Sequence, residues 1–222
     1  TLAFPNLVTL EISKNELKSL PDLSVMTPQL QRIDASVNYL EKFPKLPLSI
    51  VDICLAKNNI SVIPESIKDY PNLLKLSIEK NAIKTVPTLP SQIQHVLLSL
   101  NQITSIAEQS LPNLTQFVLS KNRLGSVPSI KDANIKEYLL CRNWIGKVQV
   151  EFFSKKITKI NLSENRIDEL PENFFSALPN LTHLYLSKNQ ITSFPKSIGE
   201  SKLILLSFSE NPIEQFPEKL PD

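Results

Sequence analysis

Glycine is scarce in this chain, which has 3 Gly against 17 Pro in 222 residues. Phosphate-cradling loops need closely spaced glycines, and Gly125, Gly146 and Gly199 stand far apart. Cysteine and histidine are equally scarce, with two residues of each. These shortages exclude a disulfide-dense scaffold and a metal site built from clustered His and Cys side chains.

Long hydrophobic runs and a marked charge excess are missing too. No apolar stretch approaches the roughly 20 residues that a membrane-spanning helix needs, so we expect no membrane insertion. The 24 basic and 22 acidic side chains leave a net charge of +2, which gives no drive toward nucleic acid or anionic lipid. The hydrophobic content of 41% is nevertheless enough for a folded core.

One asparagine recurs along the whole chain at intervals of 20 to 24 residues. Its ten positions are Asn15, Asn38, Asn58, Asn81, Asn101, Asn122, Asn143, Asn165, Asn189 and Asn211. The first repeat reads Leu7-x-x-Leu10-x-Ile12-x-x-Asn15-x-Leu17, and all ten repeats have apolar residues in the same slots. A fixed period of this length is the sequence signature of a solenoid.

This frame resembles L-x-x-L-x-L-x-x-N-x-L, the motif of leucine-rich-repeat proteins, over essentially the whole chain. The resemblance implies an α/β fold: a right-handed solenoid, curved like a horseshoe, with a parallel sheet on its concave side and extended or short helical segments on its convex side. We expect residues 1–222 to form a single domain of about ten repeats. Because both ends fall within a repeat and carry no polar cap, we expect the chain to be a fragment of a longer polypeptide.

Alternation within the frame sets the two faces of each strand: Leu10 and Ile12 should point inward, and Glu11 outward. The Asn amide can hydrogen-bond backbone groups of its own and adjacent turns, so we expect the ten asparagines to form a structural ladder. Asn and Pro would then shape the turns in place of glycine. Eight prolines lie six residues after an Asn, where the chain should leave the strand: Pro21, Pro44, Pro64, Pro87, Pro128, Pro171, Pro195 and Pro217.

Repeat length separates two kinds of convex segment. The two 20-residue steps contain the proline-bounded stretches 44–47 and 87–90, which should be extended and polyproline-like. The 22–24-residue steps have room for a helical turn or two, as over residues 172–178. The short kind resembles repeats of secreted bacterial effectors, and the longer kind resembles those of intracellular eukaryotic scaffolds.

No arrangement of side chains for catalysis is visible. His95 and His183 hold the same outward slot four repeats apart, roughly 19 Å at the strand spacing of ~4.8 Å. Cys54 and Cys141 also lie four repeats apart, beyond the Cα separation of about 7 Å that a disulfide allows. We therefore predict no enzyme, no metal site and no cofactor in this segment. Unpaired thiols indicate a reducing compartment, so we expect a cytoplasmic location.

The outward residues of the predicted strands form columns on the concave face. The central column reads Glu11, Asp34, Cys54, Ser77, Leu97, Val118, Leu139, Asn161, Tyr185 and Ser207. The column beside the Asn is mostly basic, with Lys14, Lys57, Lys80, Lys121, Arg142 and Lys188. Exposed contiguous apolar residues on a charged surface mark interaction sites, where aromatic and Arg side chains are frequent anchors. We predict a protein-binding patch made of His95, Leu97, Leu100, Val118, Lys121, Leu139, Arg142 and Tyr185.

Trp144, the only Trp, follows one of the asparagines. It either extends the predicted patch or packs against the edge of a neighbouring repeat, and the sequence leaves both readings open. A column of serines near the strand ends fits small, locally bonded hydroxyls better than a nucleophile or phosphorylation array.

The resemblance to intracellular scaffolds implies a monomeric module that binds a partner protein on its concave face in signalling. A signalling GTPase, phosphatase or kinase is the kind of partner implied. Three alternatives stay open. The segment is a regulatory or targeting domain of a larger enzyme (a protein phosphatase, cyclase or ubiquitin ligase), a bacterial effector domain, or an extracellular receptor domain.

Overall fold

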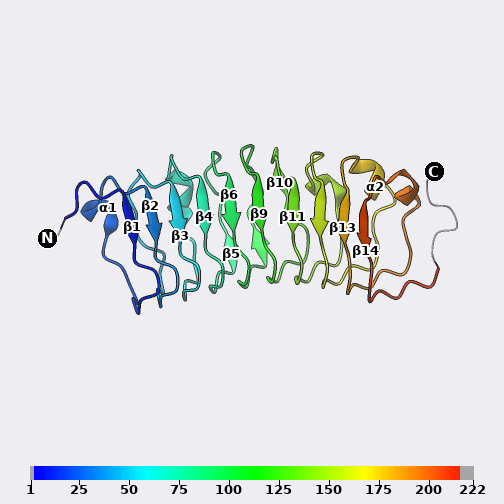
Figure 1. Cartoon of the computed structure of the whole chain (residues 1–222), viewed down its shortest axis with the longest axis horizontal. Coiled ribbons are helices and arrows are strands. Elements are labelled where there is room, and N and C mark those ends of the chain that lie inside the picture. Colours follow the sequence, from blue (N-terminus) through cyan, green and yellow to red (C-terminus); the bar gives the residue numbers. More distant parts are fainter. Residues whose placement is uncertain (1–2, 216–222) are drawn as a thin grey trace.

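Ten short strands pair in chain order into one parallel sheet that runs the length of the molecule (Figure 1). The computed structural model describes residues 3–215 of the 222, so Pro217 lies outside the described residues. The predicted α/β solenoid with a parallel sheet is confirmed. The strands of this sheet are β1 (Thr9–Glu11), β2 (Arg32–Asp34), β3 (Asp52–Cys54), β4 (Lys75–Ser77), β6 (His95–Leu97), β9 (Gln116–Val118), β11 (Glu137–Leu139), β12 (Lys159–Asn161), β13 (His183–Tyr185) and β14 (Leu205–Ser207).

Neighbouring strands pair without any shift of the repeat frame. The middle residue Leu10 aligns with Ile33, Ile33 with Ile53, and at the far end Leu184 with Leu206. The middle residues of the eight inner strands are at most 2% exposed, whereas Leu10 and Leu206 in the outermost strands are only partly buried. The alternation predicted from the sequence therefore places one apolar side chain of every strand in a continuous core.

The recurring asparagine bonds neighbouring repeats together, as predicted. Nδ2 of Asn122 donates to the carbonyls of Leu98 and Leu119, both at 3.0 Å, and Oδ1 accepts from the N–H of Ile103 at 3.0 Å. Leu98 and Ile103 belong to the preceding repeat. The same three bonds recur at the asparagines from Asn38 to Asn211, as at Asn38 itself.

The residue before each of these asparagines has a left-handed backbone. The ten φ angles lie between 53° and 60°, a region that normally favours glycine. None of the three glycines has a positive φ. The interpretation that Asn and Pro replace glycine is thus incomplete. Each of these turns needs a positive φ, and the residue that adopts it is the non-glycine residue directly before the Asn. These residues are Lys14, Val37, Lys57, Lys80, Leu100, Lys121, Arg142, Glu164, Lys188 and Glu210.

The conformation of each convex segment depends on the length of its repeat, as expected for both kinds of segment. Among the described residues, the two 20-residue steps have no helix over 44–47 or 87–90. Each step of 22–24 residues carries one helical turn: α1 (Leu23–Met26), η1 (Glu65–Asp69), η2 (Val150–Phe152), α2 (Phe174–Ala177) and η3 (Lys196–Glu200). No helix in the part of the chain that the structure describes is long and apolar enough to cross a membrane.

Two small parallel pairs of strands lie outside the main sheet, and the sequence did not predict them. β5 (Thr85–Val86) pairs with β7 (Ser105–Ile106), and β8 (Gln109–Ser110) pairs with β10 (Ile130–Lys131). Gln109 and Ile130 are 21 residues apart, which is also the spacing of Asn101 and Asn122. Equal repeat lengths therefore keep the two segments in register far beyond the strand.

Aromatic rings form a chain inside the core at the C-terminal half of the molecule. Phe117 and Tyr138 come from the sheet, whereas Phe153, Phe174 and Phe175 come from the convex side. Successive ring centroids lie 6.1, 5.5, 6.5 and 5.2 Å apart, all in edge-to-face geometry. The rings thus join the sheet to η2 and α2 across the core.

Candidate protein-binding surface

The outward side chains of the ten strands lie on one face of the sheet, which we call the sheet face. The strand register aligns its central column as predicted: Leu97 of β6 pairs with Val118 of β9, and Val118 pairs with Leu139 of β11. The same register continues to Asn161 and Tyr185. The columns predicted from the sequence are therefore the columns of the structure.

Leu97, Val118 and Leu139 form an apolar row across three neighbouring strands. The sequence analysis took them as exposed, but all three are half-buried. Neighbouring parallel strands lie only ~4.8 Å apart, so each of these side chains covers part of the next. The row still presents apolar surface, and it does so as one continuous strip.

A hollow of about 350 Å³ lies beside this row. It is lined by His95, Thr115, Gln116, Val118, Lys136, Glu137 and Leu139. Within the part of the chain that the structure describes, Nδ1 of His95 is buried without a hydrogen-bond partner. The hollow thus joins two residues of the apolar row to an imidazole side chain.

Tyr185 is not part of the same strip. It lies two strands beyond Leu139, and Asn161 occupies the column between them. Oδ1 of Asn161 accepts from the N–H of Ser163 at 3.1 Å, so a polar side chain interrupts the apolar surface. The structure brings together His95, Leu97, Val118 and Leu139 but leaves Tyr185 apart.

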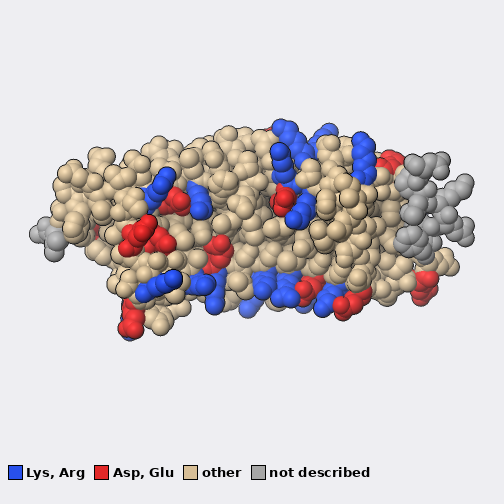
Figure 2. Space-filling view, in the orientation of Figure 1, with Lys and Arg blue, Asp and Glu red and all other residues tan. Residues whose placement is uncertain are grey.

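Leu100, Lys121 and Arg142 follow one another along the edge where the strands end. They occupy the left-handed positions, and Leu100 is 44% exposed. Nε of Arg142 lies 2.8 Å from a carboxylate oxygen of Glu164, which raises the pKa of the arginine. Figure 2 shows Lys and Arg side chains along the lower edge of the molecule, with Asp and Glu side chains among them.

The N-terminal part of the sheet face is polar and carries an internal network. Burial opposes ionisation of Asp34, but hydrogen bonds from Ser36 hold its pKa below the ordinary value. Burial raises the pKa of Cys54, whose thiol donates to Oγ of Ser77 at 3.8 Å. A thiol held in its protonated form is a poor nucleophile.

The two histidines lie in separate repeats, as do the two cysteines. His95 and His183 hold equivalent positions in β6 and β13, with three strands between them. Cys54 and Cys141 are both free thiols. No group of three or more His, Cys, Asp or Glu side chains among the described residues could hold a metal ion.

Trp144 packs against the neighbouring repeats, which is the second of the two interpretations; that it extends the predicted patch stays a prediction. It is 47% exposed, and it also lies between two arginines of the neighbouring repeats. The guanidinium carbons of Arg123 and Arg166 lie 5.7 and 5.1 Å from the centroid of its ring. Both distances are within the range of cation–π contacts.

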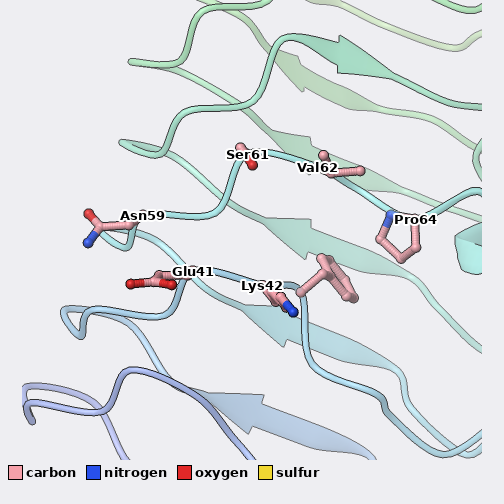
Figure 3. A pocket seen from close by; sticks show the side chains of 7 residues that line it. Glu41, Lys42, Asn59, Ser61, Val62 and Pro64 are labelled. Carbon is pink, nitrogen blue, oxygen red and sulfur yellow. The ribbon is translucent and has the colours of Figure 1, made fainter.

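A larger hollow, of about 550 Å³, lies on the flank of the molecule and was missed by the sequence analysis (Figure 3). It is lined by Glu41, Lys42, Phe43, Asn59, Ser61, Val62 and Pro64. Val62 is 65% exposed. Among the residues four positions after each ladder Asn it is the apolar one and the others are polar, so the sequence does contain a signal for this hollow. In the next two repeats the equivalent residues, Thr85 and Ser105, are paired in β5 and β7.

Comparison with known families finds a model described as leucine rich repeat, which matches residues 133–191 and 155–213. Fibromodulin of Oryctolagus cuniculus is 37% identical over 68 residues, which is 30% of this chain and 46% of the relative. The chain therefore spans less than half the length of this curated relative.

Solved structures share the fold over nearly the whole chain. The APL1 leucine-rich repeat domain has a TM-score of 0.85 at 22% identity and covers 96% of this chain and 58% of its own. Toll, in the Toll–Spatzle complex of Drosophila, has a TM-score of 0.78 at 21% identity, with 93% and 30% covered. YopM from Yersinia enterocolitica WA-314 has a TM-score of 0.76 at 24% identity, with 97% and 49% covered.

Proposed function

Because this chain is a leucine-rich-repeat protein, we propose that it binds a partner protein on its sheet face. The observation that carries this proposal is the apolar row Leu97, Val118 and Leu139, which the strand register makes continuous. Such strips on an otherwise charged surface are characteristic of interaction sites. The similar chain Toll was solved in a complex with Spatzle, which is in keeping with this kind of function.

The partner would place an apolar side chain on the row and a polar group in the hollow beside it. His95 lines that hollow, and its imidazole supplies a side chain that can hydrogen-bond the partner's polar group. Lys121, which is exposed beside the row, would meet acidic groups of the partner at the rim. A signalling GTPase, phosphatase or kinase is the partner class that we propose.

Two aspartates in the apolar row test this function. Val118→Asp together with Leu139→Asp would put two desolvated charges into the interface and abolish capture of the partner in affinity purification. Both side chains are half-buried on the sheet surface, so circular dichroism and the melting temperature should change little.

A matched control is available on the other side of the molecule. Val25 and Leu48 are 74% and 61% exposed and lie away from the main sheet. Val25→Asp with Leu48→Asp introduces the same charges from the same residue types and should leave binding intact. Retained binding by the sheet-face variant, or equal loss with the control variant, would move the interface elsewhere.

We also propose a reducing, cytoplasmic location. The two free thiols, Cys54 and Cys141, support it, since secreted proteins rarely keep unpaired cysteines. Fractionation of cells that express the full-length protein, with immunodetection, tests the location. Recovery from the medium or from secretory compartments contradicts it and favours a receptor-type or secreted parent protein.

A further inference from the structure

Three residues that directly follow ladder asparagines form a stack on the edge where the strands end. The N–H groups of Arg123, Trp144 and Arg166 each donate to the preceding repeat, to Ile103, Leu124 and Ile145, at 2.9 Å. The ladder thus fixes the three backbones one repeat apart. The guanidinium groups of the two neighbouring repeats both lie over the ring of Trp144, with their central carbons 5.7 and 5.1 Å from its centroid.

Neither arginine of this stack forms an ion pair with another described residue. Among the ion pairs of the described residues, none involves Arg123 or Arg166, and Glu164 pairs with Arg142 instead. The chain as a whole is nearly neutral at +2, so the positive field is local rather than a property of the entire surface.

Two glycines lie beside the stack, and backbone conformation does not require them. Gly125 and Gly146 each come three residues after a ladder Asn, and neither has a positive φ. A Cβ atom on Gly125 would meet nothing within 4 Å, and one on Gly146 would meet only the carbonyl oxygen of Arg166 at 4.0 Å. Their effect is a strip of bare backbone next to Trp144, where another chain can approach closely.

We propose that this edge binds an extended acidic peptide segment of a partner protein. We name Arg123, Trp144, Arg166, Gly125 and Gly146 together the exit edge. Arg123 and Arg166 are two repeats apart, roughly 10 Å at the ~4.8 Å repeat spacing. A peptide in the polyproline II conformation rises ~3.1 Å per residue with three residues per turn, so carboxylates three residues apart lie on one side, about 9 Å from each other, and match the two arginines. An aliphatic side chain between them would contact the free rim of the indole.

Peptide chemistry fits this edge better than a sulfated polysaccharide does. Two guanidinium groups already lie over the Trp144 ring, which makes the ring a poor platform for a stacked sugar. The bare backbone at Gly125 and Gly146 favours the approach of a narrow peptide backbone over that of a bulkier chain of pyranose rings. The exit edge is a different surface from the sheet face, so the two proposals fail independently.

Trp144 is the only Trp, so its fluorescence reports on this edge alone. The probe is an acetylated twelve-residue peptide that repeats Glu-Thr-Val, labelled with fluorescein for anisotropy, and its Gln-Thr-Val counterpart is the neutral control. We expect a saturable change in Trp144 fluorescence and in anisotropy with the Glu peptide, weakened by added salt, and no change with the Gln peptide.

Two variants test the residues separately. Arg123→Gln with Arg166→Gln should weaken binding of the Glu peptide about fivefold or more, since each exposed charge pair is worth little alone. Gly125→Leu fills open space and should keep the melting temperature while it blocks the peptide. Arg32→Gln removes the same charge from β2 and should leave binding unchanged.

Three results would overturn the proposal. Equal binding of the Glu and Gln peptides would show that carboxylates are not recognised. Unchanged binding by the double arginine variant would place the peptide elsewhere. Tighter binding of a heparin fragment than of the Glu peptide, lost in the same variant, would assign the edge to a sulfated polysaccharide.

Discussion

The side chain of the ladder asparagine is the smallest unit of this fold that explains its regularity. At Asn122 one amide satisfies two carbonyls and one N–H of two different turns, all of them buried. A turn that packs against other turns on both sides has no water to satisfy those groups. The asparagine therefore replaces solvent in the interior of the stack.

Asn122→Ala removes these three bonds and leaves their backbone partners unpaired. We expect a loss of about 1–3 kcal/mol in the free energy of unfolding, because buried unsatisfied groups carry their full desolvation cost. Asn15→Ala is the matched control, since Asn15 is exposed and donates to carbonyls of its own turn. Denaturant unfolding of both variants measures the difference, and equal losses would contradict a ladder that works between repeats.

Val37 has the least favourable residue type among the left-handed positions. Its φ is 56°, and β-branched side chains are strained in that region. Val37→Gly should raise the free energy of unfolding by about 0.5–1 kcal/mol, because relief of strain exceeds the added freedom of the unfolded chain. Val62→Gly replaces another exposed valine, outside the left-handed positions, and should destabilise. Melting temperatures that move in the same direction for both variants would argue against backbone strain at Val37.

At the scale of elements, the sequence predicts the features that a single repeat determines and misses those that depend on contacts between several repeats. Strand position and face follow from the repeat frame, so the apolar row of Leu97, Val118 and Leu139 was predictable to the residue. The pairing of β8 with β10 was not, because it requires two consecutive repeats of equal length to keep their convex segments in register. The hollow at His95 was missed for a related reason: its walls come from three strands and depend on side-chain directions.

The aromatic chain is the element-scale feature with the clearest energetic role. Phe153 lies between Tyr138 and Phe174, at centroid distances of 5.5 and 6.5 Å, and joins η2 to the sheet and to α2. Phe153→Ala should cost about 3–5 kcal/mol, from lost burial and the cavity left behind. Thermal or denaturant unfolding measures it.

Tyr138→Phe serves as the control for this prediction. The variant keeps the ring and removes a hydroxyl whose bond to the carbonyl of Pro128 is long, at 3.4 Å. Its stability should change by less than about 1 kcal/mol. A large loss with Tyr138→Phe and a small one with Phe153→Ala would mean that the hydroxyl, and not ring packing, organises this part of the core.

At the scale of the whole molecule, each repeat contacts its neighbours in the stack. The Asn bonds, the strand pairs and the ring contacts run within one repeat or between adjacent repeats, so stability is close to a sum of nearest-neighbour terms. In such a stack, an outermost described repeat has one neighbour where an inner one has two. The burial of the strands reflects this, since the middle residues of β1 and β14 are only partly buried.

Amide hydrogen exchange tests this one-dimensional picture. The N–H of Leu119 donates to Leu139 at 3.0 Å in the middle of the sheet, and the N–H of Ile12 donates to Asp34 at 2.8 Å near its N-terminal end. If the length of the hydrogen bond alone set the exchange rate, the two amides would be equally protected from exchange, or the amide of Ile12 slightly more. A stack that opens from its ends predicts that Leu119 exchanges more slowly, because opening there must break contacts on both sides. Uniform protection along all ten strands would instead show that the solenoid opens in a single cooperative step, with coupling that extends well past adjacent repeats.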